Sequence, residues 1–271
     1  SDIGGFMLRS WMTQEGPDFE ELYIRWVQFG AFSPLMRDHS WHGKHHPWAN
    51  GERGLKNFKN YYNLRLCLMD KIYSSALQSK VEGGTVVDSM AIAYGMSPTI
   101  DLQYVFCDDF LVRPIVELGE RKVNVIFPED GFCDLYTGKQ YKAGEYEVRA
   151  PLEQIPVFIK AGSVIPYNCY AEGVVPTWEK ENYQEAMLLT APVQERKSTF
   201  YSDEDVVQFT SIPQEEGYKV LASKPCKRRV VMIVGKAELF ADVEIVETSY
   251  DAKSNRTMVV LSDDWTVLVV K

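Results

Sequence analysis

The sequence is short of the residues that mark several common classes of protein. Of its 271 residues, 29 are Lys or Arg and 38 are Asp or Glu, so the net charge is -9. Because contacts to phosphates require clustered basic side chains, this balance argues against a nucleic-acid-binding protein. The one basic run, KPCKRR at 224–229, is short, and we interpret it as a solvated turn before a strand. No apolar run is long enough to predict a membrane-spanning helix, so no membrane partner is expected.

Cysteine is also scarce, and its spacing excludes two further classes. The five cysteines are scattered, odd in number and form no CxxC pair. This pattern fits neither a disulfide framework nor a zinc ribbon, and it favours free thiols in a reducing compartment. We therefore predict a cytoplasmic protein. The opening residues, SDIGGF, carry neither an initiator Met nor a signal peptide, and we expect the sequence to be a piece of a longer chain.

Apolar residues are plentiful, and their spacing predicts two helices near the start. Hydrophobic residues make up 45% of the chain and aromatics 13%, which is enough for two or three domains with buried cores. A helix is expected over 17–30, since Pro17 suits a first helical position and Gly30 a last one. A second helix is expected over 57–78, where apolar residues again recur at helical spacing.

The segment between these helices predicts a strand that carries function. Residues 35–39 (LMRDH) are short and follow a helix and its turn, as in an α/β arrangement. Because side chains alternate along a strand, Leu35, Arg37 and His39 share one face. Two basic side chains on one face of a buried strand favour a functional role.

The four histidines of the chain, His39, His42, His45 and His46, lie close together, which raises the question of a metal site. Zinc sites use three or four ligands at defined spacing, but no Cys lies nearby and no HExxH helix is present. We predict no metal, and a histidine-loop metalloprotein remains the weakest alternative. His39 differs from the other three because it ends a strand, whereas they lie on a loop.

After residue 82 the pattern changes to short strands separated by turns, which predicts two antiparallel β domains. We expect domains over residues 1–81, 82–170 and 171–271, with a Pro- and Glu-rich join at 171–182 and a β-sandwich at the end. The strands expected in the first β domain are 104–107, 111–116, 122–127, 146–148, 157–160 and 163–166. Those expected in the second are 186–190, 198–201, 219–222, 230–234, 243–247, 257–261 and 266–270.

Several motifs in order resemble the C-terminal portion of glycoside hydrolase family 31, the family of α-glucosidases and α-xylosidases. They are SDIGGF, ELYIRWVQFGAFSPLMRDH, HPW, DLQY with FLV, VIFP, YTG, and APL through IPVFIKAGSVIP. The resemblance extends from residue 1 to about residue 167 and is only architectural beyond. It implies α/β plus all-β structure: the last two βα units of a (β/α)8 TIM barrel, then two antiparallel β domains.

The resemblance also implies roles for individual residues, because barrel active sites lie at the C-terminal ends of the strands. Asp2 would end the seventh strand and bind a hydroxyl or orient a neighbouring base, and His39 would end the eighth and hydrogen-bond the cleaved sugar. Arg37 would brace carboxylates in the pocket wall. Phe6 would form an apolar platform for the leaving group, and Trp41 would flank the mouth. Trp48 is more often a loop anchor, and the histidine-rich loop departs from the family pattern.

The family hydrolyses glycosides with two carboxylates and retention of configuration, and its motifs for both groups are missing here. Asp108-Asp109 and Asp263-Asp264 lie in the expected β domains, and we predict that neither pair is catalytic. The resemblance therefore implies part of a retaining α-glycosidase, acting on an α-glucoside or α-xyloside without a cofactor. The nucleophile and the acid/base would lie outside this chain.

The missing carboxylates leave an alternative open, namely a non-catalytic β module that binds carbohydrate or a partner protein. The expected partners are an oligosaccharide or glycoside and the remainder of the barrel, since two strands cannot close one. A homo-oligomer stays compatible with the sequence. Because the two helices should pack on barrel strands that this chain does not carry, we expect the isolated chain to be aggregation-prone.

Overall fold

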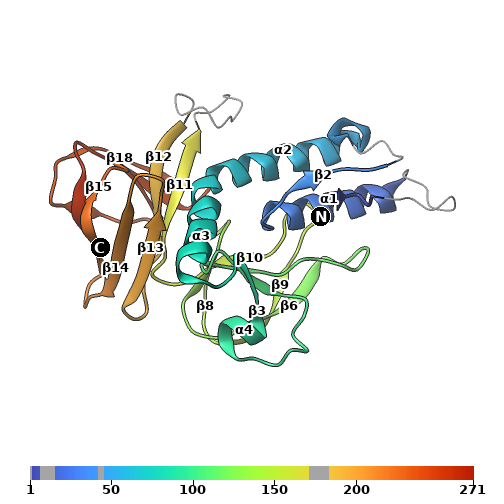
Figure 1. Cartoon of the computed structure of the whole chain (residues 1–271), viewed down its shortest axis with the longest axis horizontal. Coiled ribbons are helices and arrows are strands. Elements are labelled where there is room, and N and C mark those ends of the chain that lie inside the picture. Colours follow the sequence, from blue (N-terminus) through green and yellow to red (C-terminus); the bar gives the residue numbers. More distant parts are fainter. Residues whose placement is uncertain (1, 7–15, 42–45, 171–182) are drawn as a thin grey trace.

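The computed structural model describes residues 2–6, 16–41, 46–170 and 183–271 of the chain. Helices α1 (Pro17–Ala31) and α2 (Gly51–Cys67) run alongside each other at one end of the molecule, and a β-sandwich forms the other end (Figure 1). Helix α3 (Met69–Glu82) lies between the sandwich and a smaller β unit that also carries α4 (Met90–Tyr94). Within the described ranges, no helix is both long and apolar enough to cross a membrane.

Two short parallel strands, β1 (Asp2–Ile3) and β2 (Arg37–Asp38), begin the fold. Asp2 lies opposite Arg37, and Ile3 lies opposite Asp38. The strand is shorter than the expected 35–39, but the predicted alternation is confirmed. Leu35, Arg37 and His39 are exposed, whereas Met36 and Asp38 are half-buried.

Helix α1 begins at Pro17 as predicted and ends one residue later than expected, at Ala31. Proline is tolerated there because the first N–H groups of a helix have no partner within it. Asp18 and Glu20 occupy the first turn, where a carboxylate interacts favourably with the positive end of the helix dipole. Tyr23 and Val27 are fully buried and direct one face of the helix into the core.

The prediction of one helix over 57–78 is wrong. The structure has a 3-10 turn, η1 (Pro47–Ala49), and then α2 and α3, which meet at Leu68. The Leu68 N–H donates to the Leu64 carbonyl at 3.1 Å and the Ile72 N–H to the Leu68 carbonyl at 3.0 Å, so helical hydrogen bonds continue through the break. The direction changes because α2 packs against α1, whereas α3 packs against strands of the sandwich.

Arg25 links α1 to two loops, one that precedes strand β6 (Lys122–Phe127) and one that follows strand β9 (Gly144–Arg149). Its guanidinium donates to the carbonyls of Pro151 at 3.0 Å, Gln154 at 3.1 Å, Glu120 at 3.1 Å and Ala150 at 2.9 Å. Burial lowers the pKa of Arg25 to about 10, so the side chain stays protonated at neutral pH. Four loop carbonyls are thus satisfied by one buried cation from a distant helix.

The smaller β unit consists of short antiparallel strands. Its main sheet, within the described residues, has the order β3 (Val87–Ser89), β4 (Tyr104–Phe106), β5 (Phe110–Val112), β10 (Val157–Ile159), β7 (Phe132–Asp134) and β8 (Gln140–Tyr141). Beside it lies the pair β6 (Lys122–Phe127) and β9 (Gly144–Arg149). Phe127 packs against Tyr141 and Phe158 across these sheets and so ties them into one core.

The sandwich consists of two sheets whose facing residues form a core around Trp265. In the described part of the chain, one sheet has the order β11 (Val164–Tyr170), β12 (Tyr183–Leu189), β16 (Val230–Val234), β19 (Arg256–Leu261) and β18 (Ile245–Asp251). The other has β13 (Arg196–Tyr201), β14 (Val206–Pro213), β15 (Tyr218–Cys226), β20 (Trp265–Val270) and β17 (Leu239–Ala241). Every adjacent pair is antiparallel except β12 with β16.

Strand β11 differs from the sequence-based grouping. We expected 163–166 in the first β domain, but β11 pairs along its whole length with β12 of the sandwich. Periodicity predicts a strand and does not say which sheet it joins, which explains the error. The division at residues 81 and 170 stays a prediction, and the expected join at 171–182 lies outside the described residues.

Candidate functional site

The ends of β1 and β2 bring Asp2 and Arg37 into direct contact. Asp2 Oδ1 accepts two hydrogen bonds from the Arg37 guanidinium, from Nε at 2.8 Å and from Nη2. The Arg37 side chain is 61% exposed and that of Asp2 is 22% exposed. A pair this open contributes at most about 1 kcal/mol to stability, because water screens it. Its arrangement fixes the orientation of the Asp2 carboxylate at the strand edge.

Phe6 and His39 meet beside this ion pair. Their ring centroids are 5.1 Å apart with an interplanar angle of 33°. The Trp41 N–H donates to the Phe6 carbonyl at 3.0 Å, which holds the segments after both strands together. His39 is exposed and Phe6 half-buried, so the imidazole nitrogens lie where a solute can reach them. An aromatic ring beside an imidazole and a fixed carboxylate suits a ligand with both apolar and hydroxyl surfaces.

A buried contact beneath the strands supports this edge, and the sequence did not reveal it. The Tyr23 hydroxyl donates to Asp38 Oδ2 at 3.0 Å. Burial, followed by the negative charge of Asp38, raises the pKa of Tyr23 well above its ordinary range. Asp38 points to the opposite side of the strand from Arg37 and His39, so alternation alone could have suggested an anchoring role.

The two tryptophans of the adjoining loop are both exposed. Trp41 is 68% exposed and Trp48 is 69% exposed, and the Trp48 ring stacks on His46 at 4.7 Å with an interplanar angle of 10°. The roles predicted for Trp41 and Trp48 stay predictions. His42 and His45 lie outside the described residues. Among the residues that the structure describes, no group of three or more His, Cys, Asp or Glu side chains could hold a metal ion.

Asp109, in the turn between β4 and β5, occupies a buried ion cluster. Its carboxylate contacts Lys71 Nζ at 2.5 Å and Arg196 Nη2 at 2.6 Å and accepts from Ser163 Oγ at 2.6 Å. Burial by itself raises the pKa of Asp109, but the charges of Lys71 and Arg196 outweigh it and lower the pKa to about 2. A carboxylate so tightly held joins α3, the smaller β unit and the sandwich, and its contacts are those of a structural group.

The second aspartate pair, Asp263 and Asp264, lies on the surface of the sandwich. Both pair with Arg229, at 3.2 Å and 3.0 Å. The Asp263 side chain is 73% exposed. This arrangement offers no enclosed space for a substrate.

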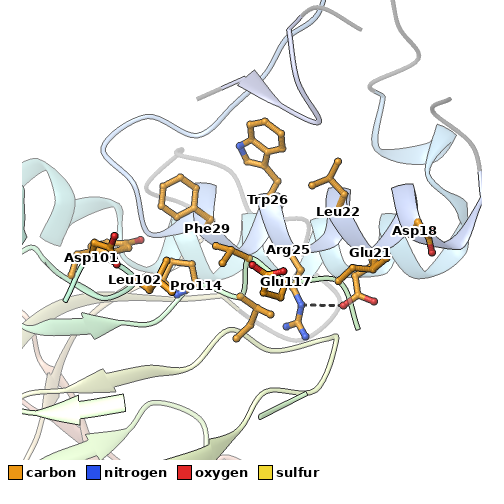
Figure 2. A pocket seen from close by; sticks show the side chains of 14 residues that line it. Asp18, Glu21, Leu22, Arg25, Trp26, Phe29, Asp101, Leu102, Pro114 and Glu117 are labelled. Atoms are coloured by element: carbon orange, nitrogen blue, oxygen red, sulfur yellow. Dashed lines mark ion pairs between the residues drawn. The ribbon is translucent and has the colours of Figure 1, made fainter. Parts of the chain in front are cut away.

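A groove of about 640 Å³ runs along α1, and none of the predicted site residues lines it. Figure 2 shows Leu22, Trp26 and Phe29 of α1 in this groove, with Pro114 and Glu117 from the loop after β5. A smaller cavity of about 260 Å³ lies between α3 and the sandwich. Asp2, Arg37 and His39 line neither of these two cavities.

Two family models match most of the described fold. Residues 1–75 match the model described as "Glycosyl hydrolases family 31 TIM-barrel domain". Residues 83–165 match "Glycosyl hydrolase family 31 C-terminal domain". These matches and the β sheets confirm the predicted fold class, the end of a (β/α)8 barrel followed by antiparallel β domains.

Curated relatives include α-glucosidases that are much longer than this chain. "Alpha-glucosidase 2" of Bacillus thermoamyloliquefaciens is 32% identical over 173 residues, which cover 60% of this chain and 21% of that protein. "Probable glucan 1,3-alpha-glucosidase" of Arabidopsis thaliana is 30% identical over 173 residues, covering 61% and 18%. The chain thus spans about a fifth of the length of these relatives.

Solved structures share the fold over the whole chain. The cycloalternan-forming enzyme of Listeria monocytogenes superposes with a TM-score of 0.81 at 23% identity, covering 100% of this chain and 29% of that one. The dextranase of Flavobacterium johnsoniae gives 0.81 at 23% identity, covering 100% and 39%. The sandwich is included in both superpositions, so the architecture is common beyond the reach of the family models.

Proposed function

The chain belongs to glycosyl hydrolase family 31, and on that premise we propose that it is one part of a retaining α-glycosidase. The whole enzyme would hydrolyse an α-linked glycoside, with glucose or xylose as the non-reducing sugar. The nucleophile and the acid/base would be carboxyl groups outside this chain, so the reaction would need no cofactor.

The grouping of four residues at the ends of β1 and β2 carries the proposal. Both Arg37 bonds go to Asp2 Oδ1, and Oδ2 would accept a hydrogen bond from a sugar hydroxyl. His39 would donate to or accept from a second hydroxyl of the cleaved sugar. Phe6, beside His39, would offer its face to the apolar side of the leaving group, with Trp41 farther out at the mouth.

The test is hydrolysis of p-nitrophenyl α-glycosides by the full-length polypeptide, with the configuration of the first product followed by NMR. We expect turnover of an α-glucoside or α-xyloside with retention. In the same protein, His39→Ala should lower kcat/KM by roughly 10-fold to 100-fold, the equivalent of one lost hydrogen bond to a charged or polar group. The control is His46→Ala, which removes another exposed imidazole from the adjoining loop. Absence of turnover with every α-sugar would contradict the proposal.

A non-catalytic module that binds carbohydrate or a partner is the second candidate. The contacts of the two aspartate pairs favour this candidate. Asp109 is held in a buried ion cluster and Asp263 lies on an open surface, so neither pair is placed to act as nucleophile and acid/base. The coding sequence upstream of Ser1 separates the two. A barrel with a nucleophile Asp in the same reading frame would eliminate the module hypothesis.

We also propose a cytoplasmic location, which rests on the thiols. Each of the five cysteines is free, and burial raises the pKa of Cys107 and Cys133 to about 12. Such thiols are inert and suit a reducing compartment. Fractionation of the native cells, with thiol titration of the purified protein, tests the location directly.

A further inference from the structure

The cavity of about 260 Å³ between α3 and the sandwich, which we call the α3–sandwich cavity, has no part in the proposed hydrolysis. Its walls come from α3, from β12 of one sheet, and from β13, β14 and β15 of the other sheet. Figure 1 shows α3 beside β13, and the two elements are in contact. Because pockets for drug-sized ligands measure about 300–1,000 Å³, this cavity suits a ligand of about one six-membered ring.

Aromatic side chains line part of the cavity. They are Tyr73 of α3, Tyr183 of β12, and Phe200 and Tyr201 of β13. Tyr73 is 45% exposed, and its hydroxyl donates to Asp203 Oδ1 at 2.5 Å, which restrains the ring. The C–H groups on one face of a sugar ring pack well against an aromatic ring, because both surfaces are apolar and flat.

A buried cation holds two carboxylates in the wall of the cavity. The Arg228 side chain is 5% exposed, and its Nη2 pairs with Asp70 Oδ2 and lies 3.7 Å from Glu185 Oε1. Its Nη1 donates to the Ala186 carbonyl and to Asn168 Oδ1, both at 3.2 Å, so the guanidinium is fixed. The side chains of Asp70 and Glu185 are 27% and 40% exposed. Their carboxylates therefore remain accessible as hydrogen-bond acceptors for a ligand.

The turn after β13 and the loop after β15 add charges of both signs. Lys227 Nζ lies 3.6 Å from Glu204 Oε2, and their side chains are 72% and 79% exposed. Asp205, which also lines the cavity, pairs with Lys224. The cavity thus offers acceptors and an ammonium donor around aromatic rings, and much of its charge is already compensated within the protein.

We propose that the α3–sandwich cavity binds one neutral pyranose ring. Hydroxyls of the sugar donate to the carboxylates of Asp70 and Glu185, a hydroxyl oxygen accepts from Lys227, and the apolar face of the ring packs on Tyr73. A sugar carries donors, acceptors and an apolar face together, which matches this mixed wall. The inference does not depend on the proposed hydrolysis, because no residue at the ends of β1 and β2 lines the cavity.

Three other kinds of ligand fit the cavity less well. A small ammonium ion would be repelled by Lys227, and it would meet carboxylates that Arg228 and Lys224 already neutralise. An anion would lie against carboxylates that outnumber the cations in the wall. A metal ion lacks ligands, since no suitable group of three His, Cys, Asp or Glu occurs in the part of the chain that the structure describes.

The direct test places 3-fluorotyrosine at position 73 of the full-length polypeptide and follows its fluorine NMR signal during titration with D-glucose, D-galactose, D-mannose or D-xylose. We expect a saturable shift with at least one of these sugars, with a Kd of roughly 1–10 mM. Sorbitol, which has hydroxyls but no ring, and methylammonium should give none at the same concentrations. A shift with methylammonium alone, or no saturable shift with any of the four sugars, would overturn the site.

The matched control carries the same label at position 250 of the sandwich. Tyr250 is 42% exposed and its hydroxyl donates to Asn255 Oδ1 at 2.9 Å, so its environment resembles that of Tyr73 except for the cavity. We expect no saturable shift from this label. Equal shifts at positions 73 and 250 would indicate a general effect of the solute and overturn the site.

A substitution in the wall provides the second test, read from the label at position 73. Glu185→Ala should weaken sugar binding by roughly 10-fold, because a hydrogen bond to a charged acceptor is lost. Glu247→Ala removes an exposed carboxylate from β18 and should leave the Kd unchanged. Thermal unfolding of both variants verifies that they are folded. Equal affinities for the two variants would count against the site.

A third variant keeps this inference separate from the proposed function. In His39→Ala we expect the titration at position 73 to be unaltered while hydrolysis decreases. A shift that disappears in His39→Ala would assign the sugar to the ends of β1 and β2 and overturn the cavity site alone. A saturable shift in a wild-type polypeptide that hydrolyses no α-glycoside would overturn the glycosidase proposal alone.

Discussion

The barrel segment, which is the described part of the chain up to Glu82, and the sandwich form their cores in different ways. The core of the sandwich is formed by its own two sheets, from Val164 and Met187 to Trp265 and Val270. The barrel segment has a parallel sheet of two short strands within the described residues. Its buried residues, such as Ile3 and Tyr23, share one cluster with Phe106 of the smaller β unit and with Ile165 and Leu188 on one sheet of the sandwich.

This difference indicates that stability and the proposed function depend on different residues. The residues of the proposed sugar site lie at or just after the ends of two short strands, where Arg37 and His39 are exposed and Asp2 and Phe6 are half-buried. The residues that hold the molecule together are apolar side chains of the β units and a few buried ion pairs at their junctions. The following substitutions test this division, beginning with the largest expected effect.

Trp265→Ala should produce the largest loss, because the ring is fully buried in the sandwich and its Nε1 donates to the Arg228 carbonyl at 2.9 Å. We expect a decrease of about 3–5 kcal/mol in the free energy of unfolding, measured by urea denaturation with circular dichroism. The matched control in the barrel segment is Trp48→Ala, which should cost less than about 0.5 kcal/mol. Similar costs for the two would remove the contrast between the regions.

Asp109→Asn tests the ion cluster that joins the two regions. Lys71 and Arg196 would lose the charge between them, and breaking such a buried pair costs about 3–5 kcal/mol, somewhat less where the amide keeps hydrogen bonds. Asp263→Asn, on the exposed surface, should cost less than about 0.5 kcal/mol. A loss limited to one region, observed by hydrogen exchange, would show that the cluster does not couple them.

The same cluster predicts a dependence on pH. Since folding lowers the pKa of Asp109 from 3.8 to about 2, its stabilising contribution is complete above the higher value and is lost as the pH falls toward the lower one. Urea denaturation across this range should show a steeper loss of stability for the wild type than for Asp109→Asn. Parallel curves for the two proteins would contradict the assignment.

Tyr23→Phe tests the support beneath the proposed sugar site, with a smaller expected effect. Loss of the buried hydroxyl that donates to Asp38 should cost about 1–2 kcal/mol. Tyr73→Phe is the control, because the Tyr73 hydroxyl donates at 2.5 Å to an exposed acceptor, Asp203, and its loss should cost less than about 0.5 kcal/mol. Equal values would mean that burial does not distinguish the two contacts.

Arg37→Ala should have the smallest effect on stability, less than about 1 kcal/mol, since its pair with Asp2 is open to water. In the full-length enzyme we nevertheless expect kcat/KM to fall by roughly 10-fold, because the Asp2 carboxylate would lose its fixed orientation. Arg53→Ala removes a similarly exposed pair, with Glu153, and should leave kinetics unchanged. Equal kinetics for both variants would place Arg37 outside the site.

Local patterns predicted local features well. The start of α1 at Pro17 and the shared face of Arg37 and His39 follow from proline geometry and from alternation, which need no knowledge of distant residues. The break at Leu68 has no glycine or proline to mark it, and it arises because two halves of one helical pattern pack on different partners. The contact between Tyr23 and Asp38 likewise depends on how a helix lies beneath a strand.

The guanidinium of Arg25 has a consequence for the order of events during synthesis. The carbonyls that it binds include Pro151, Ala150 and Gln154, which follow it by 126, 125 and 129 residues. At a translation rate of about 5–20 residues per second, helix α1 leaves the ribosome several seconds or more before these acceptors exist. Until then its cation has none of these carbonyls to bind, although α1 can already pack against α2 through Asn57, so we expect the N-terminal segment to complete its packing only after this loop has been synthesised.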